Sequence, residues 1–146
     1  VSVEMALRAW KGQVYAIEKK EDALALLKEN RRKFATDNLE IVPGTAPEAM
    51  VELPVPTHAF IGGSSGNMNE IIRLLLDKNP GVRIVINCIT LETVTEAMNA
   101  IRDFSLTDVD IVQLSAARSK SIGRYHMMMG ENPIYIISCS GRGEEI

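Results

Sequence analysis

The chain alternates short apolar runs with segments in which apolar residues recur at helical spacing. The apolar runs are rich in Val, Ile and Tyr, which favour strands, and they span residues 13–17, 39–42, 58–61, 82–87, 109–114 and 134–139. Nearly continuous runs of this kind are typical of strands covered on both faces, as in a parallel sheet flanked by helices. The alternation therefore predicts a doubly wound α/β fold, which binds its ligands beyond the carboxyl ends of the strands.

Four segments carry a helical pattern. Residues 2–10 have helical character, and residues 21–34 follow with an acidic first turn that suits the helix dipole. Asn67, with Glu70 three residues later, resembles a capping box, and Thr90 is a candidate N-cap for the next helix. The residues that we expect the last three helices to turn toward the core are Leu24, Leu27 and Phe34; Met68, Ile71, Ile72 and Leu75; and Leu91, Val94, Met98 and Ile101.

Size and composition narrow the class of protein. A chain of 146 residues with 46% hydrophobic content suits one domain over residues 1–146. The formal charge of -3 and a pI near 5.4 argue against a general nucleic-acid binder, which needs a broad basic face. No apolar run approaches the roughly 20 residues needed to cross a bilayer, and no signal peptide is recognised. We therefore expect a cytoplasmic protein with neither nucleic acid nor a membrane as its partner.

The cysteine and histidine content argues against a metal site and a disulfide. Cys88 and Cys139 each lie inside a strand-like run and are far apart in the sequence, so we expect two buried thiols. Two isolated cysteines and two histidines do not complete a zinc site.

No helical pattern separates the last two strand-like runs. We expect them to pair antiparallel as a hairpin at the edge of the sheet, joined by a loop over residues 115–132. That loop concentrates potential ligand-binding side chains, namely Arg118, Lys120, Arg124, Tyr125 and His126. Because the arginine fork matches the geometry of a carboxylate, the loop is a candidate clamp for several carboxylates, although it could also be an exposed basic loop.

The segment HAFIGGSSGN, residues 58–67, ends an apolar run in two glycines directly before a helix. Glycines there let the backbone approach a ligand closely, and the helix start offers unpaired N–H groups. The segment also fits the G-x-S-x-G nucleophile elbow with Ser64 as nucleophile. The partners of that serine would be Asp108 or Asp110 and then His126, but a hydrolase sheet of this type normally has more strands before the elbow.

Two strand ends suggest a nucleotide site. Glu18 follows the first strand. At this position a nucleotide-binding sheet places a carboxylate that accepts hydrogen bonds from the ribose hydroxyl groups. A solvated glutamate at the start of a helix is the alternative. After the next strand, residues 44–47 form a small-residue turn with room for a flat base.

The chain resembles a known family in five places: VYAIEK, GTAPEA, AFIGGSSGN, NCITLET and QLSAARSKSIGRYHMMMGENPIYIIS. Together these segments are similar to the decarboxylating precorrin C(15)-methyltransferases of cobalamin biosynthesis, which also occur as the C-terminal half of a fused C(5),C(15) enzyme. The resemblance covers nearly the whole chain. It implies a class I methyltransferase fold, which is Rossmann-like and mostly parallel with an antiparallel C-terminal edge hairpin. It also implies S-adenosylmethionine as donor, a precorrin tetrapyrrole as acceptor, and a homo-oligomer, often a homotetramer.

The resemblance also implies roles for residues. For the cofactor, Glu18 with Lys19 beside it would hold the ribose, Thr45 and Ala46 would border the adenine, and Gly62 with Gly63 would lie beside the methionine part. For the acceptor our own hypothesis is that Arg118, Ser64 and Asn67 bind it, with Arg118 and Arg124 anchoring its peripheral carboxylates. Tyr125 or His126 would handle a proton.

The family's first strand and glycine-rich turn would precede Val1, and we expect the domain over residues 1–146 to lack them because residues of the molecule are missing from the sequence. Three other functions stay open. They are methyl transfer to another acceptor such as tRNA or protein, hydrolysis through Ser64, and a nonenzymatic remnant that binds a nucleotide poorly or not at all.

Overall fold

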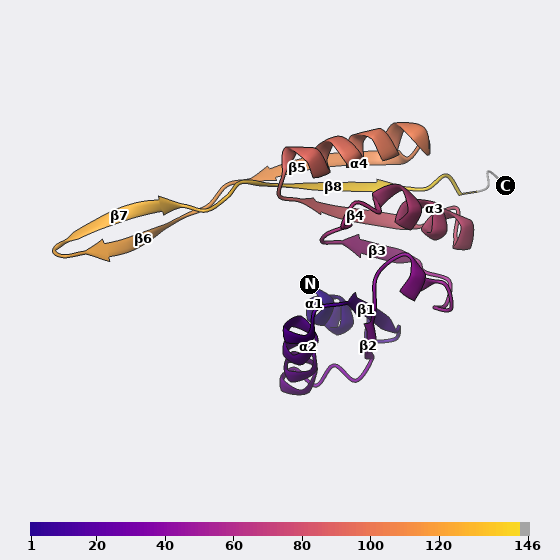
Figure 1. Ribbon diagram of the computed structural model, residues 1–146, viewed down its shortest axis with the longest axis horizontal. Helices are drawn as coiled ribbons and strands as arrows, with labels where there is room; N and C mark the ends of the chain where they lie inside the picture. Colours follow the sequence, from indigo (N-terminus) through magenta and orange to yellow (C-terminus); the bar gives the residue numbers. More distant parts are fainter. Residues whose placement is uncertain (144–146) are drawn as a thin grey trace. The chain divides into compact units, whose positions relative to one another are not determined.

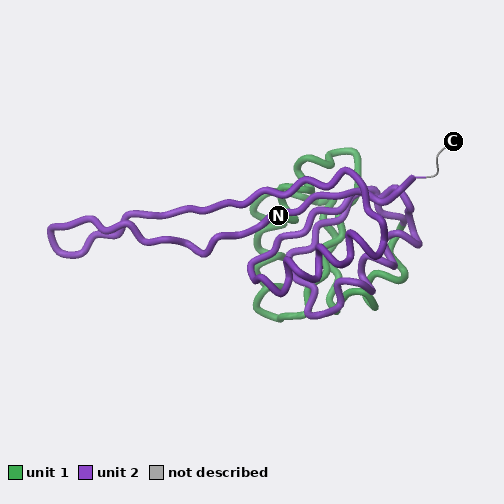
Figure 2. Tube along the Cα trace, turned by 90° about the horizontal axis from the view of Figure 1, so that it is seen from above, with its two compact units in different colours: residues 1–54 green, residues 55–146 purple. Residues whose placement is uncertain are grey.

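A computed structural model describes residues 1–143 of the chain. It divides into two compact units, unit 1 over Val1–Pro54 and unit 2 over Val55–Ile146, which Figure 2 shows in green and purple. No helix in the described part of the chain is both long enough and apolar enough to cross a membrane.

Unit 1 is a two-stranded parallel sheet with two helices. Its elements are α1 (Ser2–Arg8), β1 (Val14–Glu18), α2 (Glu21–Lys33), β2 (Leu39–Pro43) and the short 3-10 helix η1 (Glu48–Met50). The register of β1 and β2 runs from Val14 opposite Leu39 to Glu18 opposite Pro43. Because the strands are parallel, both carboxyl ends lie at the same edge.

The core of unit 1 is small and is closed by one polar side chain. Ala6 packs with Val14, Ala16 and Leu39, all of them buried. The Asn38 side-chain amide lies against the carbonyls of Ala6 and Ala9 at 2.9 Å each and of Gly12 at 3.0 Å. The Ala6 carbonyl lies in the last turn of α1, where carbonyls lack helical partners, and the Ala9 and Gly12 carbonyls follow in the turn after it, so Asn38 joins the end of α1 to the start of β2.

The expected apolar stripe of α2 is wrong at Phe34. Its side chain is exposed, and no residue of α2 is fully buried, although Leu27 packs against the core cluster. The helix ends at Lys33, and Phe34 is its C-cap with φ −99° and ψ 4°. Phe34 still donates its N–H to the Asn30 carbonyl at 2.9 Å, but the small core cluster of unit 1 does not extend to this end of the helix, so the Phe34 side chain stays exposed.

Unit 2 contains a mixed four-stranded sheet. Its elements are β3 (His58–Ile61), α3 (Met68–Lys78), β4 (Arg83–Cys88), α4 (Leu91–Asp103), β5 (Thr107–Leu114), β6 (Ala117–Ile122), β7 (Tyr125–Gly130) and β8 (Ile134–Ser140), labelled in Figure 1. The strand order is β3-β4-β8-β5. Strands β3 and β4 are parallel, and β8 is antiparallel to both of its neighbours. The predicted pairing of the last two apolar runs is confirmed, with β5 at the edge.

One face of this sheet carries the core of unit 2. Ile84, Ile86 and Cys88 of β4 are buried beside Ile137 and Cys139 of β8. The helices contribute the rest. The predicted inner stripe of α3 is confirmed, because Met68, Ile71, Ile72 and Leu75 are all buried.

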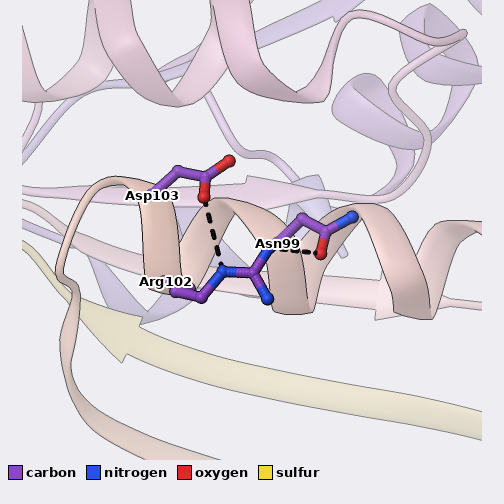
Figure 3. Close-up of polar contacts among 3 residues, drawn as sticks. All are labelled: Asn99, Arg102 and Asp103. Atoms are coloured by element: carbon purple, nitrogen blue, oxygen red, sulfur yellow. Dashed lines mark hydrogen bonds and ion pairs between the residues drawn. The ribbon is translucent and has the colours of Figure 1, made fainter.

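The inner face of α4 differs from the prediction. Ile101 is buried as predicted, but Leu91 is 72% exposed and Met98 is 41% exposed, and Ala97 and Ala100 are buried instead. Small alanines let the helix approach the sheet closely, and one residue beyond Ala97 the side chain turns about 100° away, which directs Met98 outward. On the outer side, Arg102 donates to Asn99 at 3.0 Å and lies 3.6 Å from Asp103 (Figure 3).

The two predicted caps have different outcomes. Thr90 caps α4 as expected, because its hydroxyl accepts a hydrogen bond from the Thr93 N–H at 3.2 Å. Asn67 precedes α3, but its side chain makes no cap bond, so the capping box is wrong. The backbone of Asn67 has φ −102° and ψ 24°, outside the extended region from which a capping side chain reaches back to the first turn.

The loop predicted over residues 115–132 is instead a two-stranded arm. Strands β6 and β7 pair antiparallel from Ala117 opposite Gly130 to Ile122 opposite Tyr125. The two-residue turn between them begins at Gly123, whose φ of +60° is the conformation that tight hairpin turns demand at this position. The arm extends beyond the four-stranded sheet of unit 2 (Figures 1 and 2), and every residue of both strands is exposed.

Candidate functional site

The carboxyl edge of unit 1 gathers four of the predicted cofactor residues. Glu18 ends β1 opposite Pro43, and Lys19 follows it. The Gly44 N–H donates to the Glu18 carbonyl at 3.0 Å, which ties the turn after β2 to the end of β1. That turn carries Thr45 and Ala46, so the residues expected at the ribose and at the adenine lie on adjacent strand ends.

The Glu18 carboxylate is held in a defined orientation. Its Oε1 accepts hydrogen bonds from the backbone N–H groups of Lys19 at 2.8 Å and Lys20 at 2.9 Å. The hydrogen bond from Lys20 is the main reason that the pKa of Glu18 is lowered, against a smaller opposing effect of desolvation; the Lys19 bond and the charges of both lysines also lower it. Both backbone bonds use Oε1, so an ionised carboxylate presents its second oxygen as an acceptor for hydroxyl groups.

Gly44 is a structural requirement of this edge, in addition to being part of the small-residue turn expected to border a base. Its φ is +149°, and a Cβ there would lie 2.9 Å from the Ala49 Cβ. The Ala49 N–H in turn donates to the Thr45 carbonyl at 2.9 Å. The small-residue composition of residues 44–47 was the only sign of this tight packing in the sequence.

In unit 2 the Gly62–Asn67 loop follows β3 and folds into a tight turn. The Asn67 N–H donates to the Ser64 carbonyl at 2.9 Å, and the two residues between them have positive φ, +52° at Ser65 and +86° at Gly66. Positive φ at both central residues is the pattern of a type I′ turn. The Ser64 hydroxyl is buried and donates to the Glu96 carboxylate of α4 at 3.4 Å, which fastens the loop to that helix.

Ser64 is not assembled into a catalytic triad. Its hydroxyl meets a carboxylate, not an imidazole. His126 lies near the tip of the arm, opposite Ser121. Nine positions of mostly extended chain separate His126 from Tyr135, which lies where β8 enters the four-stranded sheet. At the rise of a strand, nine positions span roughly 30 Å. No motif marked Glu96 in advance, because its place beside Ser64 depends on how α4 packs.

Gly63 has space above it. A Cβ built there would meet nothing within 4 Å, and its φ is not in the left-handed region. Neither packing nor backbone conformation therefore explains a glycine at this position, whereas the close approach of a ligand would.

We predict that Gly63→Ala leaves folding unchanged and weakens binding of ligand at this loop. The added Cβ would meet nothing within 4 Å in the protein, so the midpoint of urea unfolding should stay at its original value. A ligand that lies against the Gly63 backbone would clash with it, and affinity should fall about tenfold or more. Calorimetric titration with S-adenosylhomocysteine measures the effect, and unchanged affinity would remove Gly63 from the cofactor site.

Of the three residues expected to act on the acceptor, the arm keeps Arg124 with Tyr125 and turns His126 to the other face. Tyr125 and His126 are neighbours in β7, so their side chains leave opposite faces of the ribbon. Arg124, in the turn, donates to the Tyr125 hydroxyl through Nη2 at 3.0 Å and Nε at 3.2 Å. Its guanidinium carbon is also 5.2 Å from the Tyr125 ring centroid. Arg118 lies on β6, opposite Met129.

The two thiols are buried and free, as the sequence predicts. Burial raises the pKa of Cys88, with a further contribution from Glu96, and burial is also the main cause of the raised pKa of Cys139. Both thiols therefore stay protonated near neutral pH. Within residues 1–143 no group of three or more His, Cys, Asp or Glu side chains is arranged to hold a metal ion.

Comparison with known proteins gives a consistent result. A family model described as "Precorrin methyltransferase domain" matches residues 1–140. A relative from Methanothermobacter thermautotrophicus, named probable cobalt-precorrin-6B C(15)-methyltransferase (decarboxylating), is 38% identical over 139 residues, which are 94% of this chain and 71% of the relative. A relative from Salmonella typhimurium, named cobalt-precorrin-6B C(15)-methyltransferase (decarboxylating), is 35% identical over 140 residues, covering 95% of this chain and 72% of its own.

Solved structures agree in fold. The precorrin-6y C5,15-methyltransferase of Geobacter metallireducens superposes with a TM-score of 0.85 at 32% identity, over 95% of this chain and 74% of its own. An S-adenosylmethionine-dependent O-methyltransferase from Thermotoga maritima, at 16% identity, shares the fold with a TM-score of 0.67 over 92% of this chain and 52% of its own. The predicted class I methyltransferase fold is confirmed by these likenesses.

Proposed function

This chain belongs to the precorrin methyltransferase domain family, and we propose that it methylates a ring carbon of a precorrin or cobalt-precorrin and promotes loss of an acetate carboxyl group. The observation that carries the proposal is the family match over residues 1–140, together with relatives whose names specify C(15) methylation with decarboxylation. The reaction would belong to cobalamin biosynthesis and take place in the cytoplasm.

The donor in this proposal is S-adenosylmethionine, whose sulfonium supplies an electrophilic methyl group when bound. The carboxyl edge of unit 1 fits its nucleoside. The oriented, ionised carboxylate of Glu18 would accept the ribose hydroxyls, with Lys19 beside it, and the turn with Thr45 and Ala46 would border the adenine. Gly62 and Gly63 would lie beside the methionine part, and the open space above Gly63 supports this.

The acceptor in this proposal is held by residues of unit 2. Arg118 and Arg124 would bind peripheral carboxylates, and Ser64 and Asn67 would lie near the acceptor at the Gly62–Asn67 loop. Methyl transfer needs the acceptor carbon, the methyl group and the sulfur in line at close distance, so positioning is the main contribution of the protein. Tyr125, whose hydroxyl accepts hydrogen bonds from Arg124, would handle the proton. The side chain of His126 leaves the opposite face of the ribbon.

The direct test supplies the intact protein with methyl-labelled S-adenosylmethionine and cobalt-precorrin-6B or its metal-free counterpart. The proposal expects label in the tetrapyrrole and one carbon dioxide released per methyl group transferred. Methylation without loss of carbon dioxide would remove decarboxylation from the activity, and the absence of both products would contradict the proposal.

We also propose that the protein is a homo-oligomer and that the arm contributes to its interface. Met128 is 67% exposed on β7, and its ribbon face also carries the small residues Ala117, Ser119 and Gly130, which allow another chain to approach closely. We predict that Met128→Arg, which places a charge in that face, lowers the mass measured by light scattering. A single-chain mass for the unaltered protein would contradict the proposal.

A further inference from the structure

The two faces of the β6–β7 arm differ in chemistry. Paired residues of an antiparallel ribbon share a face, and successive residues alternate between faces. One face, here called the cationic face, carries Arg118, Lys120, Ile122, Tyr125, Met127 and Met129. The opposite face carries Ala117, Ser119, Ser121, His126, Met128 and Gly130.

The cationic face has a row of positive charge along one strand. Arg118 and Lys120 lie two positions apart on β6, about 7 Å along the strand. The bonds from Arg124 to the Tyr125 hydroxyl associate a third cation with this face. Neither β6 nor β7 contains an acidic residue, and the nearby Glu131 reaches Arg118 only at 3.9 Å with both side chains largely exposed. Such a pair holds the guanidinium weakly.

An apolar row lies beside the cations. Met129 is opposite Arg118, Met127 is opposite Lys120, and Tyr125 is opposite Ile122. Each of these four apolar or aromatic side chains, the two methionines, the tyrosine and the isoleucine, is at least 46% exposed. Methionine side chains adapt their shape to a flat apolar ligand. The face thus offers an apolar strip edged by positive charge.

We propose that the cationic face binds the acceptor tetrapyrrole, and that Lys120 is a substrate-binding residue together with Arg118. The inference rests on the proposed function and assigns its acceptor to a surface. The apolar macrocycle would lie on Met127, Met129 and Tyr125. Its peripheral carboxylates would meet Lys120 and Arg118. A second copy of this chain does not suit the same face, because stacking two such faces would bring cations together.

The position of the arm in unit 2 supports the assignment. Strand β8 is antiparallel to both β4 and β5, so β5 runs in the same direction as β3 and β4. The arm continues from the end of β5 and therefore leaves the sheet at its carboxyl edge. The Gly62–Asn67 loop follows β3 at that same edge. Within unit 2, the arm that carries the cationic face and the Gly62–Asn67 loop thus both leave the sheet at its carboxyl edge.

The test uses uroporphyrin III, a tetrapyrrole with eight carboxylates, as a probe of the intact protein in a fluorescence titration. We expect Lys120→Gln and Arg118→Gln each to weaken binding about three- to fivefold and the double variant about tenfold, as suits exposed charge pairs. The salt dependence of binding should become shallower in each variant. The matched control is Arg142→Gln, which removes one exposed cation just after β8, at the other edge of the sheet, and should leave binding unchanged.

Two results would overturn the assignment. One is an unaltered protein that does not bind uroporphyrin III, and the other is an equal loss of affinity in Arg142→Gln and in the arm variants. Titration with S-adenosylhomocysteine distinguishes these results from failure of the proposed function. The arm variants should keep the affinity of the unaltered protein for S-adenosylhomocysteine. An unaltered protein that binds uroporphyrin III but not S-adenosylhomocysteine would contradict the proposed function, and tetrapyrrole binding by the cationic face would still stand.

Discussion

Glu18→Gln is expected to weaken the binding of S-adenosylhomocysteine about tenfold to a hundredfold. Hydrogen bonds between hydroxyl groups and an ionised carboxylate contribute about 1.5–3 kcal/mol, and a neutral amide keeps the shape of the side chain but loses the charge. Calorimetric titration measures the change. Glu21→Gln, three residues along in the first turn of α2, is the matched control and should bind as the unaltered protein does. Equal affinity of Glu18→Gln and the unaltered protein would remove Glu18 from the donor site.

The same variant checks that Glu18 is ionised and held by the backbone. Its pKa in the folded protein is below the ordinary value of 4.5, mainly because of the hydrogen bond from Lys20. A depressed pKa contributes stability that is present above 4.5 and is lost as the pH falls through the folded value. The difference in unfolding free energy between the unaltered protein and Glu18→Gln should thus be constant near neutral pH and shrink in acid. A difference that grows in acid would contradict this account.

Gly44→Ala is expected to destabilise the protein and to weaken donor binding together. The φ of +149° is strained for a residue with a side chain, and the new Cβ would lie 2.9 Å from that of Ala49. Backbone strain of this kind costs about 1–3 kcal/mol. Relief of the clash would move the turn that carries Thr45 and Ala46, so affinity for S-adenosylhomocysteine should fall as well.

The control for that variant is Gly12→Ala in the same unit. A Cβ at Gly12 would meet its nearest neighbour at 3.6 Å, an ordinary contact, and its φ is not in the left-handed region. Urea unfolding should therefore give the same midpoint for Gly12→Ala as for the unaltered protein and a lower one for Gly44→Ala. Equal midpoints for the two variants would show that the turn adapts to a side chain.

The strands of the main sheets could be predicted because local pattern determines them. The run at residues 58–61 coincides with β3, and Thr90 caps α4 as expected. The arm could not be predicted in this way, because the stretch that became β6 and β7 mixes serines and basic residues with methionines. Its strands are defined by pairing with each other across the Gly123 turn. The inner face of α4 includes Ala97 and Ala100, because these small residues pack closely against the sheet. Helical spacing alone does not specify this choice.

The same distinction applies to the candidate site, because the fold class predicts some of its features and packing determines the others. Glu18, Thr45 and Ala46 could be expected together because parallel strands end at one edge, a property of the fold class. The place of Ser64 beside Glu96 depends on helix packing, and the separation of Tyr125 from His126 depends on the register of the arm. The spacing of residues in the sequence does not specify the packing of α4, and the expected loop over residues 115–132 hid the strand that separates Tyr125 from His126.

Hydrogen-exchange mass spectrometry with and without S-adenosylhomocysteine tests most directly where the donor binds. If Glu18 and the turn after β2 hold the nucleoside, the ligand should slow exchange in peptides that cover residues 14–20 and 43–50. Exchange in the peptide over α2 should change little. Binding confirmed by calorimetry, but with no slowing at either strand end of unit 1, would contradict the central claim that the methyl donor is held at this edge.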